Sequence, residues 1–264
     1  MRRVMHDDSY TISQSCINIT PLVLDRLKKL FYHTIKDIIT YTRSVIGCSF
    51  MKISKFLTVI LALALALFWL TAAIALPILL RPFYYSQARA LELDKATGFD
   101  YETIFEAYDD VMDYLVYGDE FGTGKLGWSE EGKAHFADCK GLFRLDFVVL
   151  GLSSVFIVIA LPLLRRKEET RAGTGKAAFY AALTVTLLLI TLGIWAAADF
   201  GAFFTFFHKT LFPGKTNWIF NIITDPIVLI LPYEFWMRAG ALVLGVCLGG
   251  LWLTALLLRS GRKK

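Results

Sequence analysis

The sequence predicts an all-α membrane protein with four transmembrane helices and two extracytoplasmic loops that contain amphipathic helices. Three observations lead to this fold class. Hydrophobic residues make up 56% of the 264 residues and the mean hydropathy is +0.53, both higher than an ordinary soluble domain carries. Four apolar stretches are each long enough to cross a bilayer, which takes about 20 residues. Positive charges gather on alternate connections between these stretches.

Each predicted span is a continuous apolar run, which favours a helix over a strand. A half-buried strand would alternate apolar and polar residues, and these segments do not alternate. A helix in hydrocarbon also satisfies its own backbone hydrogen bonds, so it is the expected form. The four predicted spans cover about residues 56–80, 147–164, 177–198 and 239–258.

The distribution of Lys and Arg predicts the orientation in the membrane. Lys52 and Lys55 precede the first span, "RRKEETRAGTGK" links the second span to the third, and "GRKK" ends the chain. Cytoplasmic connections carry the excess of positive charge. We therefore expect a multi-pass protein of the plasma membrane with both termini in the cytoplasm. The loops of about residues 81–146 and 199–236 then face outside.

Composition and motifs exclude several classes of function. The cytoplasmic connections explain the net charge of +5, and no basic stripe with interleaved aromatics indicates a nucleic-acid partner. The four cysteines have neither a CxxC motif nor another metal-binding spacing. The sequence contains no G-x-S-x-G elbow, no P-loop and no dinucleotide fingerprint.

Residues 1–50 are predicted to be a separate N-terminal extension. Their segment "TPLVLDRLKKLFYHTIKDIITYTRSVIG" indicates a basic helix that suits a membrane surface. Alternatively, the native protein starts at Met51, because "MKISKFLTVILALALALFWL" is complete as a short basic stretch followed by a retained anchor. We favour this second interpretation, in which residues 51–264 are the four-span membrane domain.

Two amphipathic helices are predicted in the first outer loop. In "DYETIFEAYDDVMDYLVYG" apolar residues recur at helical spacing. Three aspartates fall on or near the opposite face, which we interpret as solvated: Asp109, Asp110 and Asp113. Ser129, followed by two glutamates, is typical of the start of a further helix. On that helix His135 and Asp138 are neighbours, because residues i and i+3 share a face.

His135, Asp138 and His208 are the candidate catalytic residues. The pair in the first loop is either a polar helix surface or a general base oriented by a carboxylate. His208 stands among phenylalanines in "FFTFFHKTLFPG", where it either contacts lipid headgroups or takes part in catalysis. No metal site is expected, because the spacing H-x-x-D differs from H-E-x-x-H and no cysteine pair assists it.

Two segments of the outer loops resemble one family. "WSEEGKAHFADCKGLF" and "FFHKTLFPGKTNWIF", the latter followed by "TDPIVLILPYEFW", resemble the bacterial lipoprotein intramolecular transacylase family, called Lit. The resemblance runs from about residue 52 to the end of the chain. The family's histidine followed by an aspartate matches His135 and Asp138, and its Phe-His segment before a Phe-Pro-Gly turn matches His208. The chain departs from the pattern at Phe220-Asn221-Ile222, in place of Phe-Asp-Pro, and at Lys209, in place of a second histidine.

The resemblance implies a membrane acyltransferase. One acyl chain would move from the glyceryl sn-2 oxygen of a lipoprotein to the α-amine of its N-terminal cysteine, giving the lyso form. The partners implied are diacylglyceryl-modified lipoprotein N-termini and membrane lipid, with no cofactor. His135 and His208 would converge at the outer membrane edge, with His135 favoured as the base. The candidate substrate-binding residues lie in the second loop: Trp218, Phe207 and Glu234.

Two alternatives come from other classes of protein. In one, the outer loops bind lipid or a partner without catalysis, and their aromatic residues serve only as anchors. In the other, the protein is a metal-dependent membrane hydrolase. Substitution of the histidines separates catalysis from the first alternative, and chelation separates it from the second.

Overall fold

The computed structural model describes residues 26, 29–37, 53–118, 120–166 and 168–260. The chain divides into two compact units, Met1–Met51 and Lys52–Lys264. Residues 29–37 of the first unit are helical, whereas most of the predicted basic segment of residues 20–47, and Met51 itself, lie outside the described residues. In the described part of the second unit every regular element is helical and none is a strand, which confirms the predicted fold class.

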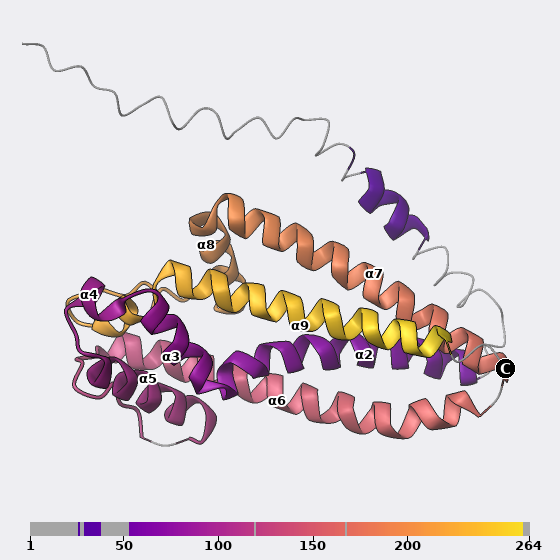
Figure 1. Ribbon diagram of the computed structural model, residues 1–264, viewed down its shortest axis with the longest axis horizontal. Helices are drawn as coiled ribbons and strands as arrows, with labels where there is room; N and C mark the ends of the chain where they lie inside the picture. The colour runs from indigo at the N-terminus through magenta and orange to yellow at the C-terminus, as the bar shows by residue number, and fades with distance from the viewer. Residues whose placement is uncertain (1–25, 27–28, 38–52, 119, 167, 261–264) are drawn as a thin grey trace, which may run out of the picture. The chain divides into compact units, whose positions relative to one another are not determined.

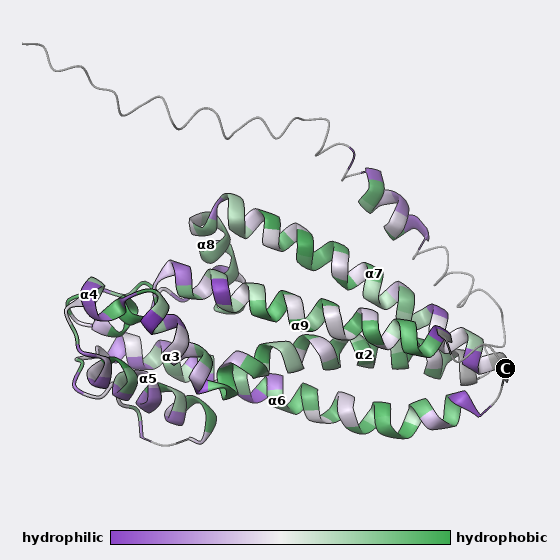
Figure 2. Cartoon of the chain, viewed as in Figure 1, coloured by the Kyte–Doolittle hydropathy of each residue, from purple (hydrophilic) through white to green (hydrophobic). Residues whose placement is uncertain are grey.

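Among the described residues, four helices are long and apolar enough to cross a membrane: α2 (Ile53–Leu79), α6 (Glu130–Arg165), α7 (Glu168–Ala198) and α9 (Tyr233–Ser260). They run alongside one another (Figure 1), and apolar residues cover most of their length (Figure 2). Large apolar side chains on these helices are exposed, including Leu152 at 67% and Val158 at 72%. Continuous exposed apolar surface of this kind suits contact with lipid. The prediction of four spans is confirmed.

Small residues let the spanning helices approach closely. Four of them are fully buried between the helices: Ala73, Ala182, Cys247 and Ala255. Gly250 of α9 leaves room for the ring of Trp69 of α2, because a Cβ at this position would lie 2.1 Å from Trp69 Cε3. The indole Nε1 of Trp69 donates a hydrogen bond to Thr254 Oγ1 at 3.0 Å. In lipid no hydrophobic driving force brings helices together, so their association depends on close packing through small residues.

The second span is longer than its apolar stretch predicts. The sequence indicates a helix that starts near Ser129 and a separate span over residues 147–164, but the structure joins both in one helix of 36 residues. At 1.5 Å per residue this helix is about 54 Å long, whereas the hydrocarbon layer is about 30 Å thick. Helical hydrogen bonds do not depend on hydropathy, so α6 continues beyond its apolar stretch. Its first turns, which carry His135, therefore project from the bundle.

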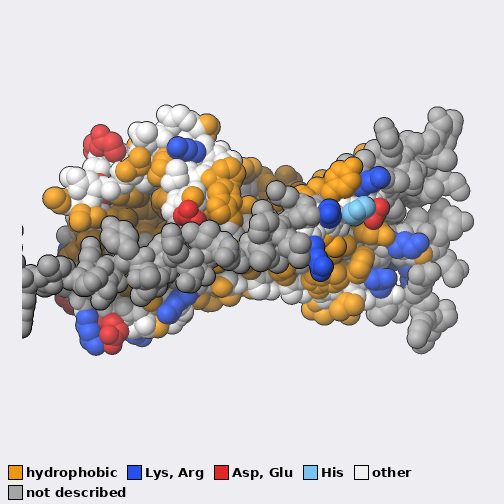
Figure 3. Space-filling view, turned by 90° about the horizontal axis from the view of Figure 1, so that it is seen from above, with side chains coloured by type: hydrophobic (Ala, Val, Ile, Leu, Met, Phe, Trp, Pro, Cys, Tyr) orange, Lys and Arg blue, Asp and Glu red, His pale blue; other side chains and the backbone are white. Residues whose placement is uncertain are grey.

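The two long loops form one helical layer at the same end of the bundle (Figure 1). The layer contains α3 (Arg81–Ala90), α4 (Leu93–Thr97), α5 (Tyr101–Val116), α8 (Phe200–Leu211) and the 3-10 helix η1 (Pro226–Ile230). Tyr84 lies at the centre of its core: the ring stacks on Tyr108 with 3.7 Å between centroids, and the hydroxyl donates to the carbonyl of Ile230 at 2.9 Å. Acidic and basic side chains both lie on the surface of this end, on the left of Figure 3.

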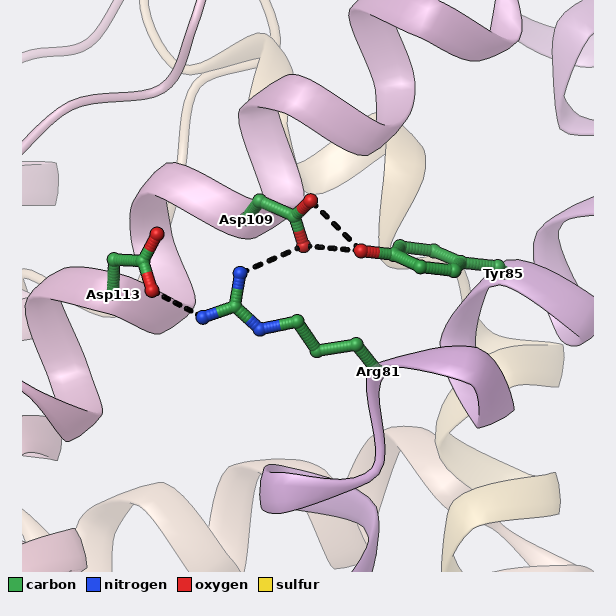
Figure 4. A network of polar contacts seen from close by, with 4 residues as sticks. All are labelled: Arg81, Tyr85, Asp109 and Asp113. Atoms are coloured by element: carbon green, nitrogen blue, oxygen red, sulfur yellow. Dashed lines mark hydrogen bonds and ion pairs between the residues drawn. The ribbon is translucent and has the colours of Figure 1, made fainter.

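The acidic cluster of α5 does not form the solvated face that we expected. Arg81, which directly follows the first span, lies between two of its carboxylates (Figure 4). It forms ion pairs with Asp109 at 3.1 Å and with Asp113, and the hydroxyl of Tyr85 donates to Asp109 at 2.7 Å. Asp110 accepts a hydrogen bond from the backbone nitrogen of Gly124 at 2.9 Å. Asp109 and Asp113 therefore hold α5 against the start of α3, next to the end of the first span. Pairing over about thirty residues is not visible in a helical periodicity.

Candidate active site

The start of α6 is fixed by side chains from both long loops. Ser129 caps the helix, and its hydroxyl accepts a hydrogen bond from Gly132 N at 3.0 Å. The carboxylate of Asp225, only 2% exposed, accepts from the backbone nitrogen of Ser129 at 2.8 Å and from its hydroxyl at 2.9 Å. A negative charge at a helix N-terminus is stabilised by the helix dipole. Asp225 thereby joins the second long loop to the turn that precedes His135.

Helix α8 supplies the second histidine. It follows α7 after a single residue, Asp199, whose carboxylate accepts from Ala202 N at 2.9 Å and caps the new helix. His208 lies in the last turn of α8 and is 8% exposed. The chain then turns at Gly214, where φ is +76°, in the left-handed region that glycine adopts without steric cost.

The structure brings His135 and His208 together from segments about seventy residues apart. Their ring centroids are 5.7 Å apart, and His135 is 5% exposed. Aromatic rings enclose the pair. The rings of Phe212 and Phe220 form T-shaped contacts with His135, at 4.9 and 5.5 Å between centroids, and Trp218 lies 4.9 Å from His208. The two imidazoles therefore share one apolar environment near the start of α6, where the helical layer lies.

The hydrogen bonding of His208 fixes the state of its ring. Nδ1 lies 2.8 Å from the carbonyl oxygen of Phe204. A carbonyl oxygen only accepts hydrogen bonds, so Nδ1 carries the hydrogen and the neutral ring has its lone pair on Nε2. Burial lowers the pKa of His208 below its ordinary value, although this backbone hydrogen bond acts in the opposite direction. A neutral imidazole with Nε2 available as a base is the result.

His135 has one nitrogen in use and one available. Its Nε2 lies 3.5 Å from Cys139 Sγ, one turn further along α6. Its Nδ1 is buried and has no hydrogen-bond partner among the described residues. Burial among apolar groups disfavours the imidazolium, so the neutral ring is favoured here too. A buried polar atom without a partner is uncommon in native proteins, which marks Nδ1 as a point of contact for a ligand.

No described hydrogen bond joins Asp138 to His135, the ring that we expected it to orient. Its two carboxylate oxygens accept from Lys215 Nζ and from Asn217 Nδ2, the latter at 3.0 Å. Lys215 and Asn217 follow the turn after α8, so Asp138 holds that loop against α6. A helical spacing indicates only neighbours on the same helix and therefore could not predict these contacts. The loop residues lie nearly eighty positions away, and their spacing gives no signal.

The three candidate substrate-binding residues lie in different surroundings. Trp218 is buried, packs against His208, and donates from Nε1 to the carbonyl of Lys215 at 2.9 Å. Phe207 is 45% exposed, with its ring centroid 5.5 Å from that of His208. Glu234 is exposed in the first turn of α9, and no described contact joins it to either histidine.

The donor atoms of the site suit proton transfer. The described residues include no group of three His, Cys, Asp or Glu side chains arranged to hold a metal ion. Two neutral imidazoles lie within one apolar surround, one with a lone pair on Nε2 and the other with an unpaired Nδ1. Such an arrangement can accept a proton at one atom and donate a hydrogen bond from another, which is the requirement of acyl transfer.

Comparisons with known proteins identify the family to which the chain is similar. The model of the family "Lipoprotein intramolecular transacylase Lit" matches residues 59–236. The in meso structure of Lit from Bacillus cereus is 26% identical, with a TM-score of 0.71, covering 79% of this chain and 95% of that chain. Two variants of that protein, with one histidine replaced by arginine or by alanine, match at 25% identity and a TM-score of 0.67, covering 79% of this chain and 91% and 93% of theirs. A search of curated proteins found no match. Because the family model matches more than half of the chain, the chain belongs to the lipoprotein intramolecular transacylase family of membrane-integral acyltransferases.

Proposed function

We propose that the protein moves an acyl chain from the sn-2 ester of a diacylglyceryl-modified lipoprotein to the α-amine of its N-terminal cysteine. The observation that carries this proposal is the pair of buried imidazoles, His135 and His208, 5.7 Å apart at the outer-layer end of the bundle. A glyceryl ester lies between the headgroups and the hydrocarbon, the depth that a site at this end of a membrane-spanning bundle would reach. The charge distribution supports an extracytoplasmic site in the cytoplasmic membrane, with both termini in the cytoplasm.

The reaction exchanges an ester for an amide without a net change in atoms. The amine nitrogen attacks the carbonyl carbon of the sn-2 ester, and the bond from that carbon to the glyceryl oxygen breaks. The nitrogen loses a proton to a base, and the glyceryl oxygen gains one. An α-amine has a reference pKa of about 7.7–8.0 and is mostly protonated near neutral pH. A base is therefore required, whereas a nucleotide or other cofactor is not.

The two histidines divide this work. His208 is the base, because Phe204 holds the hydrogen on its Nδ1 and leaves the Nε2 lone pair to take the proton of the amine. His135 is the donor to the oxyanion: when Cys139 S–H donates to its Nε2, the neutral ring carries its hydrogen on the unpaired Nδ1. This division reverses the one favoured from the sequence, which relied on Asp138 to orient His135.

The remaining groups hold the substrate and the loop. The apolar rings of Trp218 and Phe207 border His208 and suit contact with an acyl chain. Asp138 acts on the chemistry indirectly, because it holds the loop that carries Trp218. Glu234 at the start of α9 would contact the peptide part of the lipoprotein, which lies in water.

The identity of the product tests the proposal, because the competing functions predict different product masses or a different state of the α-amine. Intramolecular transfer leaves the mass of a diacylglyceryl lipopeptide unchanged and blocks its α-amine, which tandem mass spectrometry locates. A hydrolase would remove one acyl chain and lower the mass. A protein that only binds lipid would leave both the mass and the free amine unchanged. We expect the N-acylated isomer from the purified protein with or without a chelator. Loss of an acyl chain, or no product, would reject the proposal.

A further inference from the structure

Asn217, a residue of the site outside the histidine pair, has a buried side-chain oxygen without a hydrogen-bond partner among the described residues. Asn217 lies on the loop between α8 and η1, directly before Trp218, whose ring contacts His208. Its Nδ2 donates to Asp138 Oδ2 at 3.0 Å, and Asp138 lies one turn from His135 on α6. The amide therefore bridges the segments that carry the two histidines.

The hydrogen bond to Asp138 fixes which end of the amide faces the carboxylate. A carboxylate only accepts, so the amide nitrogen must face it and the oxygen must point elsewhere. That oxygen, Asn217 Oδ1, is buried and has no hydrogen-bond partner among the described residues. It is an acceptor atom only. The group that satisfies it must bring an N–H or O–H.

We propose that Asn217 Oδ1 accepts a hydrogen bond from the α-amine of the substrate cysteine and so places the attacking nitrogen beside the histidine pair. This inference rests on the proposed function. The reacting part of a diacylglyceryl cysteine offers ester, thioether and carbonyl acceptors, whereas its N–H donors are those of the α-amine and of the next peptide group. The nitrogen keeps at least one N–H as ammonium, as amine and as product amide. One acceptor can hold it throughout the reaction.

The charge around Asn217 suits a nucleophilic amine. A free carboxylate at this position would stabilise the ammonium form, which cannot attack. The charge of Asp138 is instead balanced by Lys215, and the atom offered to the substrate is a neutral amide oxygen. The amine is oriented without being held in its protonated form.

Paired ligands measure the contact directly. The first ligand is a diether analogue of the lipopeptide, in which alkyl ethers replace both esters so that no transfer takes place. The second is the same diether without the α-amino group, which keeps the following peptide N–H. We expect wild-type protein to bind the amine-bearing diether about threefold to tenfold more tightly, as one hydrogen bond gives. Asn217→Ala should bind both diethers equally. The matched control is Asn221→Ala, an exposed asparagine of the same loop, which should discriminate as wild type does.

Each outcome decides the inference. A residue that only supports the loop would, on substitution by alanine, weaken the binding of both ligands by the same factor and keep the preference for the amine. That result overturns the proposal. Equal binding of the two ligands by wild-type protein also overturns it, since water or the peptide N–H would then satisfy Oδ1. Turnover of the diester lipopeptide by wild-type protein is measured alongside, so failure of the proposed function is recognised separately.

Discussion

Substitution of Gly132 by alanine sets two physical effects against each other. Alanine has a higher helix propensity than glycine, by about 1 kcal/mol, which predicts a gain in stability. A Cβ at this position, however, would lie 2.2 Å from Asp225 Oδ1 and 3.1 Å from Phe220 Cε1. The carboxylate would have to move away from Ser129, which donates to it twice, at 2.8 and 2.9 Å.

The steric effect should prevail. Each hydrogen bond to the buried carboxylate is worth about 1.5–3 kcal/mol, so loss of both exceeds the gain in propensity and leaves a net destabilisation of about 2–5 kcal/mol. Phe220 contacts the ring of His135, so acyl transfer should fall as well. Gly141→Ala is the matched control on the same helix, because no atom lies within 4 Å of the Cβ it would add.

Thermal unfolding in detergent compares the two variants with wild type. We expect Gly132→Ala to unfold at a lower temperature than wild type, and Gly141→Ala at the same temperature or higher. If both variants are as stable as wild type, Asp225 does not hold the start of α6, and the account of how His135 is positioned is wrong.

Three further predictions follow from the charges. Single cysteines are introduced at the exposed positions Glu120 and Arg171 in a chain without native cysteines. An impermeant reagent added outside intact cells should label position 120 and not position 171. Labelling at position 171 would overturn the orientation. Because burial lowers the pKa of His208 below its ordinary 6.5, the unfolded chain takes up a proton at a higher pH than the folded protein. The contribution of the neutral His208 to stability is complete above about pH 6.5 and is lost as the pH falls. The unfolding temperature should therefore drop less steeply in acid in His208→Gln than in wild type. Identical slopes would contradict this. Lys215→Met should cost less than about 1 kcal/mol, because its ion pair with Asp138 is partly exposed, and the difference from wild type should shrink at about 1 M NaCl; a larger, salt-independent loss would mean that the pair is desolvated.

The membrane architecture was predictable from the sequence because it depends on local quantities. Continuous apolar runs of sufficient length predict the four spans, and Ser129 with the glutamates after it predicts the start of α6 at Glu130. The predicted span of residues 147–164 lies inside one longer helix, Glu130–Arg165, because charged residues such as Arg144 and Asp146 interrupt hydropathy without interrupting the helix. Hydropathy locates the part of a helix that lies in lipid and is silent on the part that projects from it.

The site was predictable in its residue types but not in its contacts. His135 and His208 were recognisable as rare titratable residues in outer loops that resemble a known family. The partners of Asp138 were not, because a helical spacing cannot indicate that Lys215 and Asn217 would take both of its oxygens. The acidic face of α5 was misinterpreted for the same reason. Pairing across loops depends on the packing of the helical layer around Tyr84, which no local pattern contains.

The rate of acyl transfer in His208→Ala tests the central claim most directly. The N-acylated isomer of a diacylglyceryl lipopeptide is followed by tandem mass spectrometry in purified wild type, in His208→Ala and in His33→Ala, a matched control in the first unit of the chain. General acid–base catalysis contributes about 10²–10⁴ in rate, so His208→Ala should fall by at least about 100-fold and recover part of the rate on addition of imidazole. His33→Ala should match wild type. A folded His208→Ala protein that forms the isomer at the wild-type rate would contradict the account.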